Sequence, residues 1–416
     1  MPWKEVSTMS LKEEFVILAG QEGANIRQLC RRFGISPKTA YKWLARFKQD
    51  GDAGLANRSR RPSTSPARTS VEMEALVLQE RQRHPAWGGR KLHAVLARRH
   101  PNLGIPHPNT ITDILRRHGA LQGPLTPPHN SHTWHRFEHS SANDLWQMDF
   151  KGYFSTTAQG YCYPLTVLDD YSRFSVALRA CPNEQKLTVQ SQLIDTFRVY
   201  GLPARITMDN GSPWGDGASP YTALTVWLMR LGVKVSHSRP YHPQTQGKDE
   251  RFHRTMKAEL LHNRVFTDLD QCQRRFDEWR DEYNLHRPHQ ALGMQVPASR
   301  YKPSGVEYPE QLPPIEYPAV GTEGVVGIRK VQGRGEIYYL GKEWDVSKAF
   351  KGYDVALKQS KTEEVLDVYF CHHKVGIIDM STQERMRLRL RLRNSASVSK
   401  TSRTSLTSSL PSSSDI

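Results

Sequence analysis

The stretch that most constrains this chain is residues 241–261, where turn-forming residues lead into an uninterrupted helical pattern. Apolar side chains recur at helical spacing along it, at Phe252, Met256 and Leu260. This periodicity predicts a loop that opens an amphipathic helix. A second face of that helix would carry one acid and two cations: Glu250, Arg254 and Lys257. One acid beside two cations is the arrangement expected of a carboxylate that holds a metal cation near a phosphate. A solvated helix face with ion pairs gives the same pattern.

The charge of the chain favours a polyanionic partner. Its 416 residues include 58 Lys and Arg against 42 Asp and Glu, which gives a net charge of +16 and a pI of about 9.6. Residues 1–120 contain 21 Lys and Arg but 10 Asp and Glu, so +11 of the excess lies there. Nucleic acid suits this basic end better than a membrane does, and the chain is long enough for several domains.

Cysteine usage and hydropathy predict a soluble protein of a reducing compartment. The five cysteines are scattered without a CxxC pair, and we find neither a signal peptide nor a long apolar run. We therefore expect no disulfide framework and no membrane partner. Cys371, His372 and His373 are consecutive, which places them poorly for a tetrahedral zinc site.

Residues 1–60 are predicted to form a helix-turn-helix DNA-binding domain. Helical patterns cover residues 10–19 and 25–33, and a basic third helix follows Gly34 over residues 37–49. Ser36 is a good N-cap and Pro37 a good first helical residue for this third helix. Helix, glycine turn and basic helix is the helix-turn-helix order, although a plain three-helix bundle with a wet basic face has the same pattern. The residues expected to reach DNA are Ser36, Lys38, Thr39, Lys42 and Arg46.

A second helix-turn-helix domain is predicted over residues 71–120. It follows a linker, residues 61–70, that is rich in Pro, Ser and Arg. Apolar-periodic runs then cover residues 71–84, 89–99 and 109–118, the last capped by Asn109 or Thr110. Two modules in series would cover a longer DNA site and raise affinity through effective concentration. Residues 121–142, rich in Pro and His, are the next linker.

Residues 143–302 show short strands followed by alternating helices and strands. Strands are predicted over residues 145–150, 161–168, 173–180, 204–208 and 233–238. Helices are predicted over residues 184–200, 221–231 and 268–289. This order implies a mixed sheet flanked by helices, in which ligands gather at strand ends.

Two acids stand at predicted strand ends, and a third lies in the helix described first. Asp149 ends the run LWQMD, Asp209 ends RITMD, and Glu250 is the third. Converging carboxylates repel one another unless one is protonated or they bind hard cations, and Mg²⁺ keeps positions open for phosphate and water. Each acid alone has a plainer explanation as a turn or a loop cap. Their joint occurrence favours a metal site.

The motifs WQMDFKG, LDDYSRF, TMDNGSP and RPYHPQTQGKDERFHRTMKAEL resemble the catalytic core of retroviral integrases and of integrase-type insertion-sequence transposases. The bacterial family numbered four-eighty-one is the nearest in pattern, and its tandem N-terminal modules also match. The resemblance implies a ribonuclease H-like core over residues 143–302. It makes Asp149, Asp209 and Glu250 the catalytic and metal-binding acids, because the motif places its acid immediately before Arg251 rather than at Asp249.

The resemblance also implies a reaction and a cofactor. Two Mg²⁺ ions, for which Mn²⁺ could substitute, would activate water against a phosphodiester at an element end. The freed 3′-hydroxyl would then attack target DNA, and no protein nucleophile is needed because positioning and charge stabilisation suffice. Residues expected to contact the DNA end are His242, Gln244, Lys248, Arg254 and Lys257.

The expected partner is therefore double-stranded DNA, as element end and as target. Joining two ends makes a homo-oligomer the expected state, and a bacterial protein of this kind would work in the cytoplasm at the nucleoid. Two alternatives remain open at this point. A DNA-binding regulator or inactive relative would keep the modules without the chemistry, and a structure-specific nuclease would cut without joining.

The C-terminal third is predicted to carry a small β-barrel. Residues 303–318 are predicted to form an extended linker. Short runs of alternating apolar and polar residues over residues 319–380 predict the barrel. Residues 381–416 begin with alternating Arg and Leu and end rich in Ser and Thr, as is typical of a disordered tail. The predicted fold class is multidomain α and α/β: tandem helix-turn-helix modules, a ribonuclease H-like mixed-sheet core and a small C-terminal β-barrel.

Overall fold

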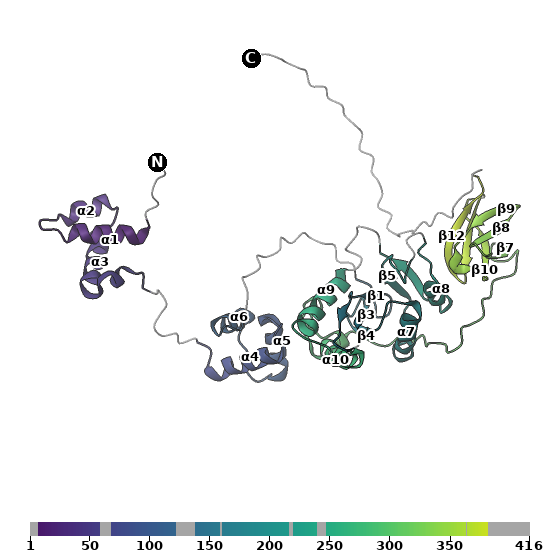
Figure 1. Cartoon of the computed structure of the whole chain (residues 1–416), viewed down its shortest axis with the longest axis horizontal. Coiled ribbons are helices and arrows are strands. Elements are labelled where there is room, and N and C mark those ends of the chain that lie inside the picture. The colour runs from purple at the N-terminus through teal and green to yellow at the C-terminus, as the bar shows by residue number, and fades with distance from the viewer. Residues whose placement is uncertain are drawn as a thin grey trace, which may run out of the picture. The chain divides into compact units, whose positions relative to one another are not determined.

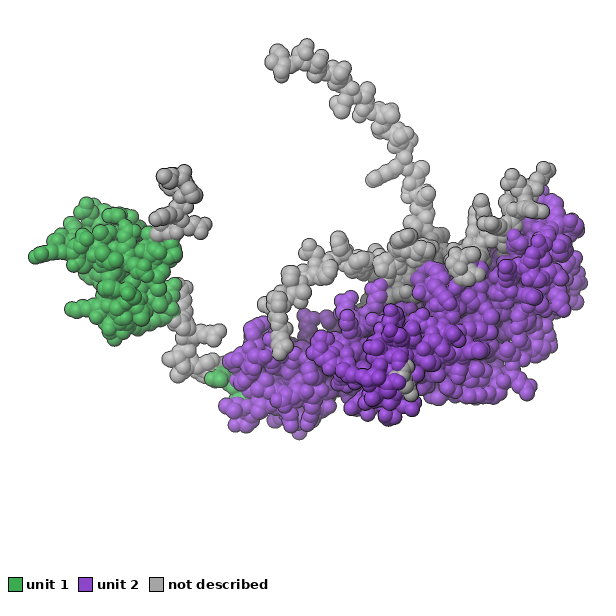
Figure 2. Space-filling model, viewed as in Figure 1, with its two compact units in different colours: residues 1–70 green, residues 71–416 purple. Residues whose placement is uncertain are grey.

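The computed structural model describes residues 7–58, 68–121, 138–158, 160–215, 219–238, 247–362 and 364–381. The chain divides into two compact units, residues 1–70 and residues 71–416, which have different colours in Figure 2. No helix within the described ranges is long and apolar enough to cross a membrane.

The first unit is a three-helix domain whose helices begin where the capping signals indicate. It contains α1 (Thr8–Ala19), α2 (Ile26–Arg32) and α3 (Pro37–Asp50), followed by a 3-10 turn over Gly51–Leu55. The Ser36 hydroxyl caps α3 by accepting the backbone N–H of Thr39 at 3.2 Å. Gly34, between α2 and α3, has a φ of +62°, in the region that favours glycine. The predicted helix-turn-helix arrangement is confirmed.

A second three-helix bundle opens the second unit. Its helices are α4 (Val71–Arg83), α5 (Gly89–Arg99) and α6 (Pro108–Arg117), packed around Val77, Trp87, Leu92, Ile111 and Leu115. The predicted cap of α6 at Asn109 or Thr110 is wrong. His107 is the N-cap, and its Nδ1 accepts the N–H of Asn109 at 3.3 Å, because Pro108 suits the first helical position.

A mixed sheet forms the centre of the second unit. Its strands are β1 (Trp146–Phe150), β2 (Phe154–Ser155), β3 (Tyr161–Asp169), β4 (Ser175–Cys181), β5 (Arg205–Met208) and β6 (Lys234–His237). The order is β2-β3-β1-β5-β6, with β4 also paired to β3. Pairs β1–β3 and β3–β4 are antiparallel, whereas β1–β5 and β5–β6 are parallel. The predicted mixed sheet is confirmed.

Helices cover both faces of this sheet (Figure 1). On one face, α7 (Lys186–Tyr200) and α8 (Ala223–Arg230) bury Leu193, Phe197 and Leu228 against Trp146 and Met148 of β1. On the other, α9 (Gly247–Met256) and α10 (Leu269–Asp281) pack against β3 and β4. The alternation of side chains along a strand explains these two cores.

The long helices of the second face end in π-helical turns that the sequence pattern did not indicate. These turns are η3 (Lys257–Leu261) after α9 and η4 (Glu282–His286) after α10. Short 3-10 turns η5 (Gln290–Leu292) and η6 (Pro297–Ser299) follow. The predicted helix through residue 261 therefore has α-helical geometry only to Met256.

Residues 303–318, predicted as a linker, lack regular structure but pack against the core. The backbone N–H of Leu202 donates to Val306 O at 2.7 Å, and Arg198 makes two hydrogen bonds to the Glu310 carboxylate at 2.8 and 2.7 Å. Tyr308 and Leu312 join the apolar core that α7 and α8 cover. The segment thus fastens to the sheet domain before the chain continues.

The C-terminal region consists of two antiparallel sheets. A four-stranded sheet has the order β12-β11-β10-β7, and β8 pairs with β9 in a separate hairpin. The strands are β7 (Val325–Lys330), β8 (Glu336–Tyr339), β9 (Lys342–Asp345), β10 (Asp354–Gln359), β11 (Val365–Phe370) and β12 (His373–Asp379), with the 3-10 turn η7 (Lys348–Phe350) between β9 and β10. Because the two sheets do not close on each other within the described residues, the predicted barrel is not confirmed.

Val226 and Met229 of α8 belong to the same apolar core as the C-terminal strands. Tyr221 adds a hydrogen bond from its hydroxyl to Val375 O at 3.3 Å, and His373 Nε2 lies 3.0 Å from Met229 O. These contacts seat the C-terminal sheets on the mixed-sheet domain. The alternating Arg and Leu of the predicted tail fall outside the described residues.

Candidate active site

Asp149 and Asp209 lie at the same level of neighbouring parallel strands. In the register of β1 and β5, Trp146 pairs with Ile206 and Gln147 with Thr207, an offset of 60 positions. The same offset joins Asp149 to Asp209, the residue after β5. Because paired strands are about 4.8 Å apart and side chains at one level of parallel strands point to one face, the structure brings these two acids together.

The two acids interact through their charges. Burial, followed by the negative charge of Asp209 and a smaller effect from Glu184, raises the pKa of Asp149 to about 6. The backbone N–H of Phe150 donates to Asp149 Oδ1 at 2.8 Å and opposes this rise. Two carboxylates that repel each other in partly buried surroundings are stabilised by a cation.

The backbone of Asp209 is held against β6. His237 Nδ1 lies 2.7 Å from Asp209 O, and Asn210 Nδ2 donates to Ser238 O at 2.8 Å. The Asp209 side chain turns back on its own loop, where Oδ1 accepts the N–H of Gly211 at 3.0 Å. The second acid is therefore fixed by contacts to the neighbouring strand.

Of the two acids in the first turn of α9, Glu250 is exposed and Asp249 is buried. Glu250, Arg254 and Lys257 are exposed, as the helical period predicts, and none of them has an ion pair with a described residue. Asp249 is 1 % exposed, and neither of its carboxylate oxygens has a hydrogen-bond partner among the described residues. Burial raises the pKa of Asp249 well above its ordinary range, with further contributions from Asp149 and Asp170.

Sequence reasoning gave Asp249 no role, although its position could have been found. Asp249, Phe252 and Met256 follow helical spacing, so Asp249 belongs to the apolar stripe and must be buried with it. In the described part of the chain, Glu250 makes no hydrogen bond or ion pair that would bring the three predicted acids together. The role of Glu250 stays a prediction.

His253 is a second residue that sequence reasoning missed. It lies on the buried face of α9, where Nε2 is 2.8 Å from Thr166 Oγ1, and the Thr166 hydroxyl donates to Asp149 O at 2.9 Å. Its Nδ1 is 4.0 Å from Asp149 Oδ2. Burial, followed by the charge of Lys151, lowers the pKa of His253 to about 4, so the ring is neutral near pH 7.

Lys248, predicted to contact DNA, is engaged inside the protein. Its ammonium forms an ion pair with the buried carboxylate of Asp170, which also accepts Gln147 Nε2 at 2.9 Å and the backbone N–H of His139 at 2.9 Å. Asp169 accepts the backbone N–H groups of Asn143 and Ser172, each at 2.8 Å. Asp170 therefore ties the start of α9 to β1 and to the end of β3.

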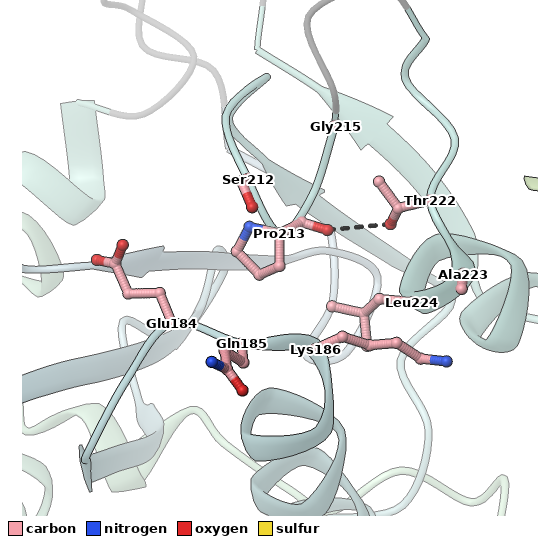
Figure 3. Close-up of a pocket in the computed structure, with 9 residues that line it drawn as sticks. All are labelled: Glu184, Gln185, Lys186, Ser212, Pro213, Gly215, Thr222, Ala223 and Leu224. Atoms are coloured by element: carbon pink, nitrogen blue, oxygen red, sulfur yellow. Dashed lines mark hydrogen bonds between the residues drawn. The ribbon is translucent and has the colours of Figure 1, made fainter.

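Glu184 lines a pocket of about 530 Å³ (Figure 3). The start of α7, the loop after β5 and the start of α8 form its walls, and the Thr222 hydroxyl donates to Pro213 O at 3.0 Å across them. Burial and then the charge of Asp209 raise the pKa of Glu184, so the pocket and the acid pair are neighbours. Nothing in the local sequence pattern singled out Glu184.

The chemistry of the donors fits a hard divalent cation. Asp149 and Asp209 supply carboxylate oxygens at the carboxyl ends of the neighbouring strands β1 and β5, and carboxylate oxygen is the ligand type that Mg²⁺ prefers. Within the described ranges, however, no group of three or more His, Cys, Asp or Glu side chains is arranged to hold a metal. The sheet therefore presents a pair of ligands rather than a complete metal site.

The predicted DNA-contacting residues of the first unit lie along α3. Ser36, Lys38 and Lys42 are exposed, whereas Thr39 and Arg46 are half-buried. Ser36 and Thr39 use their side chains in the cap of α3, with their hydroxyl oxygens 2.9 Å apart. Three cations lie over the ring of Trp43, at 3.9 Å for Lys12, 5.0 Å for Lys42 and 5.1 Å for Arg46. His242 and Gln244 fall outside the described residues.

Five family models match the chain. Two models described as integrase core domain match residues 139–243 and 231–297. The C-terminal domain of IS481 family transposases matches residues 326–386. A helix-turn-helix domain matches residues 12–63, and a homeodomain-like domain matches residues 39–115.

Two of the similar curated proteins come from bacterial insertion elements. An uncharacterized 39.2 kDa protein of insertion element IS476 from Xanthomonas euvesicatoria is 25% identical over 59% of this chain and 69% of its own length. A putative transposase for insertion sequence element IS5376 from Geobacillus stearothermophilus is 23% identical over 50% of this chain and 51% of its own length.

Solved structures include the catalytic core domain of HTLV-2 integrase in complex with magnesium. It is 15% identical, covers 39% of this chain and 97% of its own, and has a TM-score of 0.30. The family models give the stronger result, because their ranges follow chain order and include Asp149, Asp209 and most of the C-terminal strands. The chain therefore carries an integrase core domain and a C-terminal domain of the IS481 transposase type, and it is similar to transposases of bacterial insertion elements.

Proposed function

We propose that this protein binds the ends of its own mobile element, cleaves a phosphodiester there and joins the freed 3′ end to target DNA. The observation that carries the proposal is the register-matched pair of Asp149 and Asp209 within the integrase core match. Their mutual repulsion gives the free protein a site that favours a cation. The helix-turn-helix domains and the basic N-terminal third support DNA as the substrate.

Asp149, Asp209 and Glu250 would hold the metal in this proposal. Two Mg²⁺ ions, or Mn²⁺ in their place, would supply charge stabilisation for the attacking and leaving oxygens when bound. Hydrogen bonds orient both aspartate side chains: the backbone N–H of Phe150 donates to Asp149, and that of Gly211 donates to Asp209. Arg254 and Lys257, exposed on the Glu250 face, would neutralise phosphates of the DNA end.

The α3 residues Ser36, Lys38, Thr39, Lys42 and Arg46 are proposed to contact the element ends. A homo-oligomer is proposed because two ends must be joined to one target. We also propose a bacterial cytoplasmic location at the nucleoid, in keeping with the bacterial relatives. Binding should weaken steeply as salt rises, because counterions are released when cations meet phosphates.

The test is the joining of labelled DNA, taken from the ends that flank the gene, to a plasmid in the presence of Mg²⁺. Asp149→Asn keeps the side-chain shape but removes the charge, so it should lose both cleavage and joining. Asp195→Asn is the matched control, because Asp195 is an exposed acid of α7 that lies outside the site. Equal activity of wild type and Asp149→Asn would disprove the proposed role of the acid pair.

A DNA-binding regulator is the alternative function, favoured by the absence of a complete three-ligand cluster among the described residues. It predicts end binding that is indifferent to Asp149→Asn and no product from either protein. A nuclease would give cleaved ends without joined products. Chains that lack residues 1–120 should lose specific end binding under all three functions.

A further inference from the structure

His253, Thr166 and Asp149 form a hydrogen-bonded chain from α9 to β1. His253 Nε2 is 2.8 Å from Thr166 Oγ1, and the Thr166 hydroxyl donates to Asp149 O at 2.9 Å. Thr166 is fully buried and His253 is 8 % exposed, so water does not compete for these contacts. These hydrogen bonds link the backbone of Asp149, a predicted metal ligand, to the His253 ring, which faces the Asp149 side chain.

The number of protons available to these hydrogen bonds fixes the tautomer of His253. A carbonyl oxygen can only accept, so the single hydroxyl proton of Thr166 is used on Asp149 O. The Thr166 oxygen must then accept from His253, which requires the proton of the neutral ring to be on Nε2. Nδ1 consequently carries a lone pair and no hydrogen.

That lone pair faces another acceptor. Nδ1 lies 4.0 Å from Asp149 Oδ2, and two acceptors at this distance do not bond to each other. An oxygen that donates hydrogen bonds of about 2.8 Å to each could bridge a separation of this size. The opposite oxygen of the carboxylate, Oδ1, is already occupied by the N–H of Phe150.

We propose that His253 positions the nucleophile of the reaction by accepting a hydrogen bond on Nδ1 from an O–H group bound at Asp149. The inference rests on the proposed function, which supplies two such groups. One is water, which attacks during cleavage, and the other is the DNA 3′-hydroxyl, which attacks during joining. Thr166 acts through His253, because it holds the ring in the tautomer that presents a lone pair.

Two substitutions separate this role from a merely structural one. In His253→Asn the amide oxygen can take the place of Nδ1, although the contact to Thr166 is lost. In His253→Gln the longer side chain can keep an amide N–H near Thr166 but offers no acceptor at the Nδ1 position. A structural role predicts that Gln is the better replacement, whereas the proposal predicts that Asn is.

The experiment compares the full chain and these two variants on uncleaved ends, which need water, and on pre-cleaved ends, which need only joining. We expect His253→Gln to lose about 10- to 100-fold in rate, the effect of one well-placed hydrogen bond, while His253→Asn stays within a few-fold of wild type. Loss on uncleaved ends alone identifies water as the bound group. Loss on both substrates extends the role to the 3′-hydroxyl. Equal rates for His253→Gln and wild type on both substrates overturn the proposal.

A measurement on the free protein keeps this test apart from the proposed function. Selective ¹⁵N labelling of histidine, with the His253 signals assigned by their loss in His253→Asn, reports which ring nitrogen carries the proton. Protonated Nε2 and bare Nδ1 are expected without metal or DNA, and Thr166→Val should weaken that preference. Protonated Nδ1 in the wild type overturns the inference even if transposition is observed. A wild type that is inactive on both substrates argues instead against the proposed function.

Discussion

Asp149 destabilises the folded protein in the absence of a cation. Its pKa is about 6 when folded, against about 3.9 in an unfolded chain, so the folded state binds more protons between these values. Stability therefore falls as pH rises from about 4 to about 6 and stays low above that. Asp149→Asn removes this charge and should raise the free energy of unfolding at pH 7.5 by about 1–3 kcal/mol.

Urea denaturation in EDTA measures this gain, and Mg²⁺ gives the complementary result. Mg²⁺ should raise the melting temperature of the wild type but not of Asp149→Asn, because only the carboxylate binds it. The effect of Mg²⁺ should fade below about pH 6, where a proton replaces the cation. An Asp149→Asn protein that is less stable than wild type in EDTA would contradict this account.

The neighbours Asp249 and Glu250 offer a matched pair of substitutions. Glu250→Gln should abolish cleavage and joining and leave stability unchanged, because Glu250 is exposed and has no ion pair with a described residue. Asp249→Asn should gain stability at neutral pH. Its buried carboxyl keeps a proton that the unfolded chain releases, and the amide removes that difference. Activity assays and urea denaturation of both variants decide the assignment, and loss of activity in Asp249→Asn alone would move the third acid by one position.

At the residue scale, sequence patterns predicted the acids better than their surroundings. Asp149 and Asp209 could be found because both end apolar strand patterns, and the parallel pairing of β1 with β5 then aligns them. Thr166 and His253 are 87 positions apart, and no local period connects them. Their contact depends on how α9 packs against β3, which is a tertiary property.

At the scale of elements, the contact of Lys248 with Asp170 anchors the start of α9. Lys248→Met should destabilise the second unit by about 3–5 kcal/mol, because it leaves a buried carboxylate without its cation. The double variant Lys248→Met with Asp170→Asn should recover part of that loss, since no unpaired charge remains. Urea denaturation and end binding are measured together. Unchanged stability with weakened DNA binding would instead support Lys248 as a DNA contact.

Element boundaries were predictable where capping or alternation was strong. Ser36 and Pro37 start α3 as expected, and β1, β3, β4, β5 and β6 follow their predicted apolar runs. The two-residue strand β2 was not predicted. Strand β9 has no alternating apolar pattern, because KEWD has a single apolar residue, Trp344, to pack inward. Barrel closure could not be judged from alternation, because it depends on which strand edges pair.

At the scale of the whole molecule, the second unit is held together by contacts across its parts. Glu259 of η3 accepts Arg287 Nε at 2.9 Å and lies 3.7 Å from Lys91 Nζ of α5, which joins the second three-helix bundle to the sheet domain. Val226 and Met229 of α8 join that domain to the C-terminal sheets. The first unit has its own core around Phe15, Val16 and Leu55. Its removal therefore takes no side chain from the core of the second unit.

Two truncations should thus have different effects on stability. A chain without residues 1–70 should unfold at the same temperature as the second unit of the full chain. A chain without residues 319–416 should lose about 3–5 kcal/mol and bind an apolar dye, because Val226 and Met229 lose the strands that bury them. Calorimetry of both proteins beside the full chain measures the difference. Equal unfolding temperatures for the second unit in all three would show that the C-terminal sheets are seated without stabilising α8. They would then be a separable module rather than part of one folded unit with the integrase core.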